Sequence, residues 1–298
     1  MEMVVSLILV GILSGIMAIF MQVPMQSYFL SRQRLDLSDS IEPAMRHMDD
    51  ELRQALPNSV RIFSAAGVQY MEFLATRASG RYRAAVGGTG GCAGGNELQF
   101  FPSSDTCFTT IGQIVTRSPI APGVDYIVIG NKDTLGCPSP TNAYCNGPIV
   151  NKSLITAYAP AVGAAPLESR LRFNNVTFNN PGPSVSLFYV VSGPVMYSYD
   201  PAAGQLMRYS GYPISAAMVP PPVPLPAGAT SSIIASHLMC QLPDCDPAAL
   251  PPAFTLIPGS GVLNQDIVSV ILILTNNVPG QGPERVTLQA QIPVSKTQ

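Results

Sequence analysis

The chain has 298 residues, a net charge of −2 and only 11% charged residues, so its charge favours neither nucleic acid nor an anionic membrane surface as a partner. Its length allows one large domain or two ordinary ones. Charge is sparse toward the end, with only twelve Asp, Glu, Lys and Arg residues between Thr141 and Gln298. Such a surface depends on uncharged polar residues for its solubility, as in many exported proteins and assembly subunits.

The first segment, residues 3–23, is apolar apart from two serines and one glutamine. Its length matches the ~20 residues that a membrane-spanning helix needs, so we predict a transmembrane helix here. A basic start and a small-residue cleavage site are both missing, which disfavours a cleavable signal peptide. Glu2 stands at the head of this segment and is the only charged residue before Arg32. A lone carboxylate next to hydrocarbon calls for a partner or a functional reason.

The helical pattern continues beyond the apolar segment. Pro24 predicts a kink, because helical patterning resumes after it. Over residues 29–56 an apolar stripe with spacings of three and four predicts an amphipathic helix, which Pro57 closes. The stripe consists of Ile41, Met45, Met48, Leu52 and Ala55. Pro43 predicts a local break, or a new first turn, near Ser40.

After Pro57 the periodicity changes to alternating or short apolar runs bounded by Gly, Pro and Asn, which predicts β-strands. The predicted strands are Gln69–Leu74, Arg81–Ala85, Glu97–Phe101, Val124–Ile129, Leu171–Thr177, Ser186–Val191, Val195–Tyr199, Gln205–Tyr209, Phe254–Ile257, Ile267–Thr275 and Arg285–Ile292. Residues 267–275 are apolar on both faces and predict a central strand, whereas residues 284–292 alternate and predict one solvated face.

Turn residues join several of these strands. Residues 192–194, 200–204 and 279–283 each combine Gly and Pro and predict hairpin loops. Residues 219–228 are proline-rich and predict a stiff polyproline II connector, and residues 231–240 predict a short capped helix. The predicted fold class is α+β: a long kinked N-terminal helix, with a membrane-spanning first half, packed on an antiparallel β-rich globular head. The predicted domains are 1–57 for the helix and 58–298 for a β-rich head with Cys-closed loops.

The six cysteines form three close pairs along the chain, Cys92 with Cys107, Cys137 with Cys145, and Cys240 with Cys245. An even count together with a membrane segment favours disulfides in an oxidising compartment. Fifteen connectivities are possible, and we prefer the three local ones because each closes one loop. A thiolate metal site is disfavoured, because CxxC spacing and a nearby His are missing.

Catalysis is not indicated. The glycine-rich residues 86–95 lack the Gly-Lys-Ser/Thr ending of a phosphate loop, and no G-x-S-x-G or H-E-x-x-H motif occurs. His47 and His237 are expected at a helix surface and a helix end. The acidic residues between 36 and 51 are interspersed with Arg34, Arg46 and Arg53, which favours helical ion pairs over a calcium site. We predict no catalytic residue, no cofactor and no metal.

The opening "MEMVVSLILVGIL", with a glutamate before an apolar helix and a Cys-paired β-rich domain after it, resembles the type IV pilin and pseudopilin family. Residues 45–62 ("MRHMDDELRQALPNSVRI"), 71–84 ("MEFLATRASGRYRA") and 195–214 ("VMYSYDPAAGQLMRYSGYPI") are similar to minor pilins of mannose-sensitive haemagglutinin (MSHA) pilus biogenesis. In this family a prepilin peptidase removes a basic leader, and the glutamate that Glu2 would match follows four residues after the cleavage point. We therefore expect a basic leader and three further mature residues upstream of Met1.

The resemblance implies that the protein is a minor pilin that primes or caps filament assembly. It would be held in the inner membrane by a single span, with residues 58–298 as a periplasmic head, before it enters a surface pilus. Glu2 would pair with the N-terminal amine of a neighbouring subunit. The implied partners are other minor and major pilins and the assembly platform, and no nucleic acid. The alternatives are a minor pseudopilin of a type II secretion system and a pilus-tip adhesin. The residues implied for the helix and filament core are Val4, Leu7, Leu9, Gly11, Ile12, Gly15, Ile16 and Ile19.

Overall fold

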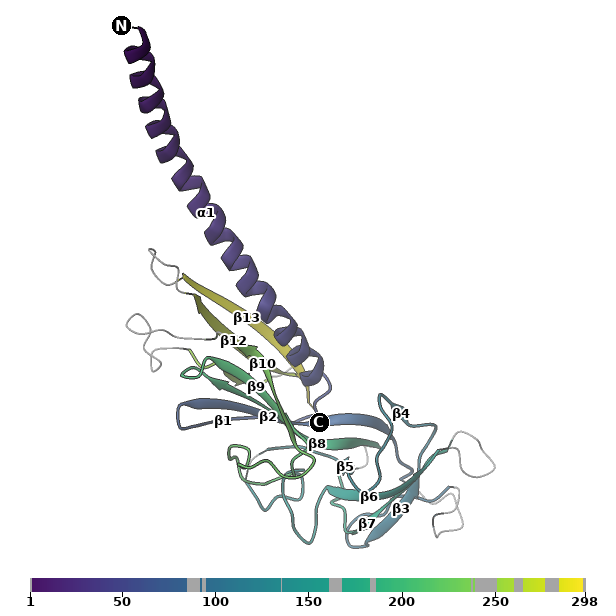
Figure 1. The fold of residues 1–298 in the computed structure, drawn as a ribbon. Coiled ribbons are helices and arrows are strands. Elements are labelled where there is room, and N and C mark those ends of the chain that lie inside the picture. The colour runs from purple at the N-terminus through teal and green to yellow at the C-terminus, as the bar shows by residue number, and fades with distance from the viewer. Residues whose placement is uncertain are drawn as a thin grey trace.

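The computed structural model describes residues 2–84, 92, 95–134, 136–160, 168–182, 186–236, 238, 251–259, 265–276 and 284–296. Its first element is helix α1, Glu2–Leu52, which continues through Pro24 and Pro43 without a break. The break predicted near Ser40 is therefore wrong. Pro43 cannot donate to the Asp39 carbonyl, but Asp39 is exposed, so water can reach this carbonyl. Figure 1 shows the N-terminal part of α1 extending away from the rest of the molecule.

Two expectations about fold and location need correction. Antiparallel strands dominate the described chain, so the fold is mainly antiparallel β instead of the predicted α+β class. Among the described residues, no helix combines the length and the apolar character needed to cross a membrane. That finding contradicts the predicted span over residues 3–23 and the single-pass inner-membrane location inferred from it. It also conflicts with the membrane-held state that the resemblance to pilins implies.

The larger sheet contains ten strands within the described residues, and its main path has the order β1-β2-β8-β5-β6-β7-β3. Strand β4 pairs with β2, and β9 links β8 to β10. The bounds are β1 Arg61–Ala65, β2 Val68–Arg81, β3 Asp105–Thr109, β4 Val115–Thr116, β5 Tyr126–Ile129, β6 Lys152–Ala159, β7 Arg170–Val176, β8 Leu187–Asp200, β9 Gln205–Ser210 and β10 Thr230–Ser236. The long β2 and β8 run antiparallel through both halves of the head (Figure 1).

The smaller sheet has the order β11-β12-β13 in the described part of the chain, with bounds Phe254–Ile257, Gln265–Asn276 and Glu284–Ser295. Strand β12 is central, as its apolar faces predict. Along β13 the solvated face is confirmed, because Thr287, Gln289 and Gln291 are exposed while Ile292 is buried.

Two elements differ from prediction for tertiary reasons. The hairpin loop expected at residues 192–194 does not form, because β8 continues through Pro194 opposite Leu74. Register shifts in β2 lie directly after Leu74, and proline is accepted inside a sheet at such bulges. The helix expected at residues 231–240 is wrong over its first part: Thr230–Ser236 is β10, which pairs with β9. The predicted turn at 200–204 does connect β8 to β9, with the Asp200 carboxylate accepting hydrogen bonds from two turn amides.

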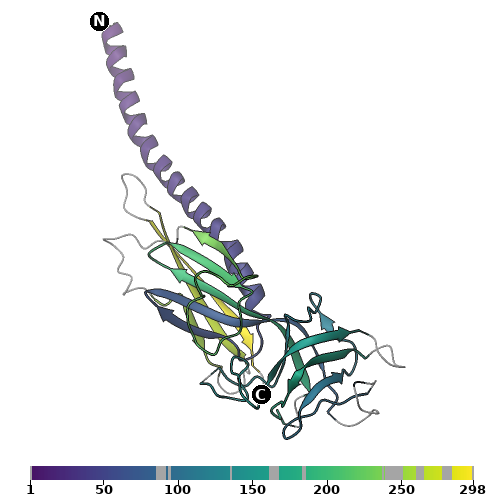
Figure 2. The same cartoon turned by 60° about the horizontal axis from the view of Figure 1, so that its bottom comes forward.

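The core has two main parts, one on each side of the head. The first lies between the C-terminal end of α1, the larger sheet and the smaller sheet, and includes Met48, Phe73, Tyr197 and Leu272. The second, with Phe108 and Phe188 in edge-to-face contact, fills the half formed by β3, β5, β6 and β7. Figure 2 shows these two halves joined by the long strands. The helix is therefore fixed to one half of the head only.

Candidate functional site

The N-terminal half of α1 exposes an apolar surface. The exposed fractions of Met3, Leu7 and Phe20 are 85%, 74% and 76%. Apart from the neighbouring residues and backbone of the helix itself, no described atom lies within 4 Å of a Cβ built on Gly11 or Gly15. The predicted core residues that the structure describes are all exposed, namely Val4, Leu7, Leu9, Gly11, Ile12, Gly15 and Ile16. The side chains of Glu2, Ile19 and Pro24 lie outside the described residues. We call residues 3–20 of α1 the free helix.

The polar groups of the free helix do not interrupt its apolar character. The Ser14 hydroxyl donates a 2.7 Å hydrogen bond to the Val10 carbonyl, one turn earlier in the helix, so it is satisfied without water. Helices that are apolar on all sides are stable when other apolar groups surround them. The free helix is therefore a surface that gains free energy from contact with a second apolar body.

The C-terminal half of α1 is anchored in the head. Ile41, Met48 and Leu52 are fully buried, as the apolar stripe predicts, and Ala44 joins them. Met45, also in the predicted stripe, packs at the edge of the same core. This burial fixes the orientation of the helix against the two sheets.

A charged network strengthens this anchor. The Glu51 carboxylate accepts hydrogen bonds from Arg208 Nη2 at 2.6 Å and from the Tyr197 hydroxyl at 2.5 Å. Burial raises the pKa of Glu51, but the hydrogen bonds from Arg208 and Tyr197 outweigh it, so the pKa is lowered overall. Burial and the Glu51 carboxylate together raise the pKa of Tyr197 far above its ordinary value. The network therefore keeps a charged carboxylate and a neutral phenol between α1, β8 and β9.

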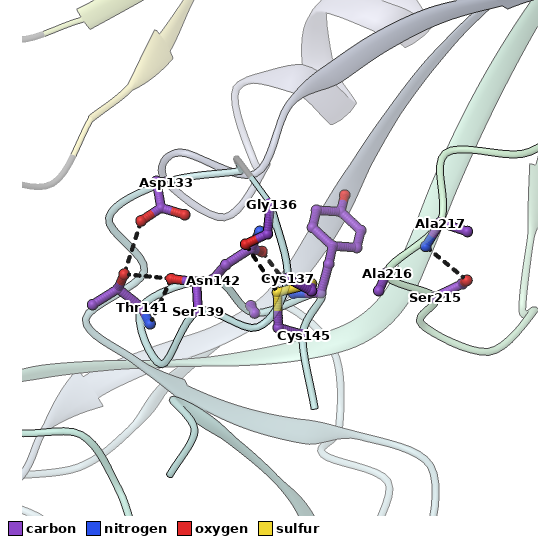
Figure 3. The surroundings of a disulfide bond; sticks show 12 residues. Asp133, Gly136, Cys137, Ser139, Thr141, Asn142, Cys145, Ser215, Ala216 and Ala217 are labelled. Atoms are coloured by element: carbon purple, nitrogen blue, oxygen red, sulfur yellow. Dashed lines mark hydrogen bonds between the residues drawn. A yellow bond between two sulfur atoms is a disulfide. The ribbon is translucent and has the colours of Figure 1, made fainter. Parts of the chain in front are cut away.

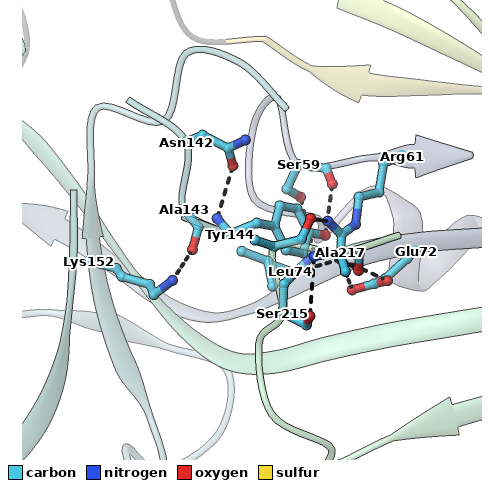
Figure 4. Close-up of polar contacts among 11 residues, drawn as sticks. Ser59, Arg61, Glu72, Leu74, Asn142, Ala143, Tyr144, Lys152, Ser215 and Ala217 are labelled. Atoms are coloured by element: carbon cyan, nitrogen blue, oxygen red, sulfur yellow. Dashed lines mark hydrogen bonds and ion pairs between the residues drawn. The ribbon is translucent and has the colours of Figure 1, made fainter. Parts of the chain in front are cut away.

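A second charged network lies at the start of the head (Figure 4). The Arg61 guanidinium donates to the buried Glu72 carboxylate at 3.0 Å and to the Ser215 carbonyl at 2.8 Å, and it lies 3.6 Å from the Tyr144 ring centroid. Burial raises the pKa of Glu72 against the opposing effect of Arg61. Burial, followed by the charge of Arg61, lowers the pKa of Lys152 to about 8. Arg61 thus ties the first hairpin to the segment that leads into the proline-rich connector.

The cysteine loops are closed as preferred from the sequence. Disulfides join Cys92 to Cys107 and Cys137 to Cys145, with Cα–Cα distances of 5.7 and 5.4 Å. Figure 3 shows the second loop, in which the Thr141 hydroxyl donates to the Asp133 carboxylate at 2.8 Å. The predicted pair Cys240 and Cys245 lies outside the described residues.

The remaining candidates for chemistry are dispersed. Glu42 pairs with Arg46 and Asp49 with Arg53 along α1, which are the ion pairs expected from the sequence. His47 is half exposed and lies 3.8 Å from Glu51, while His237 is outside the described residues. In the described part of the chain, no three or more His, Cys, Asp and Glu side chains gather where they could hold a metal ion.

Sequence reasoning missed both charged networks. One signal was available for Arg61 and Glu72: Ala66–Gly67 separates two strand-like runs, and both residues have positive φ, as in a two-residue hairpin turn. That turn places Arg61 opposite Glu72 in the β1–β2 register. No local signal connects Glu51 with Arg208, because 157 residues separate them.

Comparisons of the chain with protein-family models, with curated proteins and with solved structures found no match.

Proposed function

We propose that the protein is a structural subunit of a pilus-type filament, and that the free helix joins it to the helices of neighbouring subunits. One observation carries this proposal: a run of apolar side chains, each about half exposed or more, on a helix that projects from the head (Figure 1). Fully burying one Leu, Ile or Val side chain contributes roughly 1.5–3 kcal/mol, so even a few of these residues supply substantial association energy.

The free helix suits a helical partner in particular. Gly11 and Gly15 lie one turn apart on the same side of the helix, and the space above both is open. Small residues at this spacing let two helix backbones approach closely and increase their packing contact. The resemblance of the opening residues to pilins supports the same mode of association, with other pilins and the assembly machinery as partners.

The contacts between the C-terminal half of α1 and the head couple the free helix to the head. The buried stripe of α1 and the Glu51–Arg208 pair hold the C-terminal part of the helix on the head. Contacts made by the free helix therefore fix the position of the whole head in an assembly. The same contacts made by a flexible tail would leave the position of the head in the assembly undefined.

The proposal is tested by placing a charge on the free helix and the same charge on the head. Ile12→Asp changes a residue that is 56% exposed on the free helix, and Val223→Asp changes one that is 95% exposed on the proline-rich connector. We expect Ile12→Asp to remove the protein from sheared filaments, because a buried unpaired carboxylate is costly, while Val223→Asp remains in them. Recovery of Ile12→Asp at the wild-type level, with equal expression of all three proteins, would refute the proposal.

A further inference from the structure

A polar cavity lies where the C-terminal end of α1 meets β2 and β4. Its volume is about 250 Å³, and its walls include Arg53, Arg77 and Arg117 together with Thr76, Ser79 and Tyr189. No Asp or Glu is among the described residues that line it. The lining residues therefore include three that carry hydrogen-bond-donating guanidinium groups and none that carries a carboxylate.

Two of these arginines are neighbours where β2 meets the end of β4. The Arg117 amide donates to the Arg77 carbonyl at 3.0 Å, next to the paired residues Ala78 and Thr116. Side chains directly opposite each other in an antiparallel pair lie on the same face of the sheet. A single anion on this face can therefore contact both arginines.

The carboxylates near the cavity neutralise two of the three arginines. Asp125 lies 3.3 Å from Arg77, and Asp49 lies 2.9 Å from Arg53. Arg117 is exposed, and among the described residues it has no carboxylate partner. One positive charge at the cavity is thus left unbalanced.

We propose that this cavity binds a small oxyanion, that is a carboxylate, phosphate or sulfate group, between Arg77 and Arg117. Guanidinium groups bind these planar or tetrahedral oxygens with paired hydrogen bonds. The cavity is slightly smaller than sites for drug-sized ligands, and it suits a free oxyanion or the acidic group of a single sugar residue. This site is independent of the free helix and of the proposed filament role.

The test is calorimetric titration of the full chain at low salt with inorganic phosphate and, separately, with glucuronate. Arg117→Gln removes the unbalanced charge, and Arg172→Gln is the control, because Arg172 is an exposed arginine on β7 outside the cavity. We expect saturable binding that Arg117→Gln weakens about tenfold or more, whereas Arg172→Gln leaves it unchanged.

The two ligands distinguish the source of the anion. Tighter binding of glucuronate assigns the site to an acidic sugar, and tighter binding of phosphate assigns it to a free oxyanion. No saturable binding of either ligand to the wild type, or equal losses in Arg117→Gln and Arg172→Gln, would overturn the proposal.

Discussion

Replacing Glu51 by Gln tests how firmly α1 is held on the head. The substitution keeps the size of the side chain but removes the charge that accepts hydrogen bonds from Arg208 and Tyr197. Only about a fifth of each partner in the Glu51–Arg208 pair is exposed. Removing one partner of a largely buried pair leaves the other desolvated, so we expect the free energy of unfolding to fall by about 2–4 kcal/mol at pH 7.

The matched control is Glu42→Gln on the same helix. Glu42 pairs with Arg46 one turn away, but the side chains are 57% and 77% exposed. Exposed pairs at this spacing contribute about 0.3–0.5 kcal/mol, so this variant should unfold almost like the wild type. Urea denaturation followed by circular dichroism measures both variants.

The effect of Glu51→Gln should depend on pH with a defined sign. The pKa of Glu51 is lowered from its ordinary value of 4.5, so its stabilisation is complete above that value and is lost as the pH falls through the pKa of the folded protein. The difference between wild type and Glu51→Gln should therefore shrink in acid. Equal losses for Glu51→Gln and Glu42→Gln at pH 7, or a difference that grows in acid, would refute the reasoning.

Three further predictions concern the head. Arg61→Met should cost about 3–5 kcal/mol in urea denaturation, because it leaves the Glu72 carboxylate buried without its partner. Replacing Cys137 and Cys145 by Ser should cost about 2–3 kcal/mol, the loop entropy of a short closed segment, and should lower the thermal midpoint. Since the pKa of Lys152 is lowered to about 8, the wild type should gain stability relative to Lys152→Met as the pH rises from about 8 toward 10.5, whereas a flat difference would contradict this burial effect.

Local sequence patterns predicted the elements whose partners lie nearby or whose burial follows a simple period. The stripe from Ile41 to Leu52 identified the buried face of α1, and the apolar run at residues 267–275 identified the central strand β12. The other elements depend on pairing with strands that are distant in sequence. Residues 230–236 form a strand because β9 provides a hydrogen-bonding edge, and β8 passes through Pro194 because β2 carries a bulge opposite it.

The candidate sites show the same division. The apolar character of the free helix can be read from the sequence, since nothing else in the chain is as apolar over that length, but its exposure is seen only in the structure. The Glu51–Arg208 network and the arginine cavity join residues that are far apart in sequence, so no spacing could reveal them. The membrane span was predicted from the length of the apolar run alone. Among the described residues, no helix has both the length and the apolar character of a span, so this prediction is wrong.

The most direct test of the filament role is photocrosslinking from inside the free helix. A photoreactive amino acid replaces Leu9, which is 55% exposed, and in a control protein it replaces Val223 on the head. In intact filaments we predict that position 9 crosslinks to the N-terminal helix of another subunit, identified by mass spectrometry, while position 223 does not reach any helix. Crosslinks from position 9 that reach only head surfaces, or no other subunit, would contradict the proposed function.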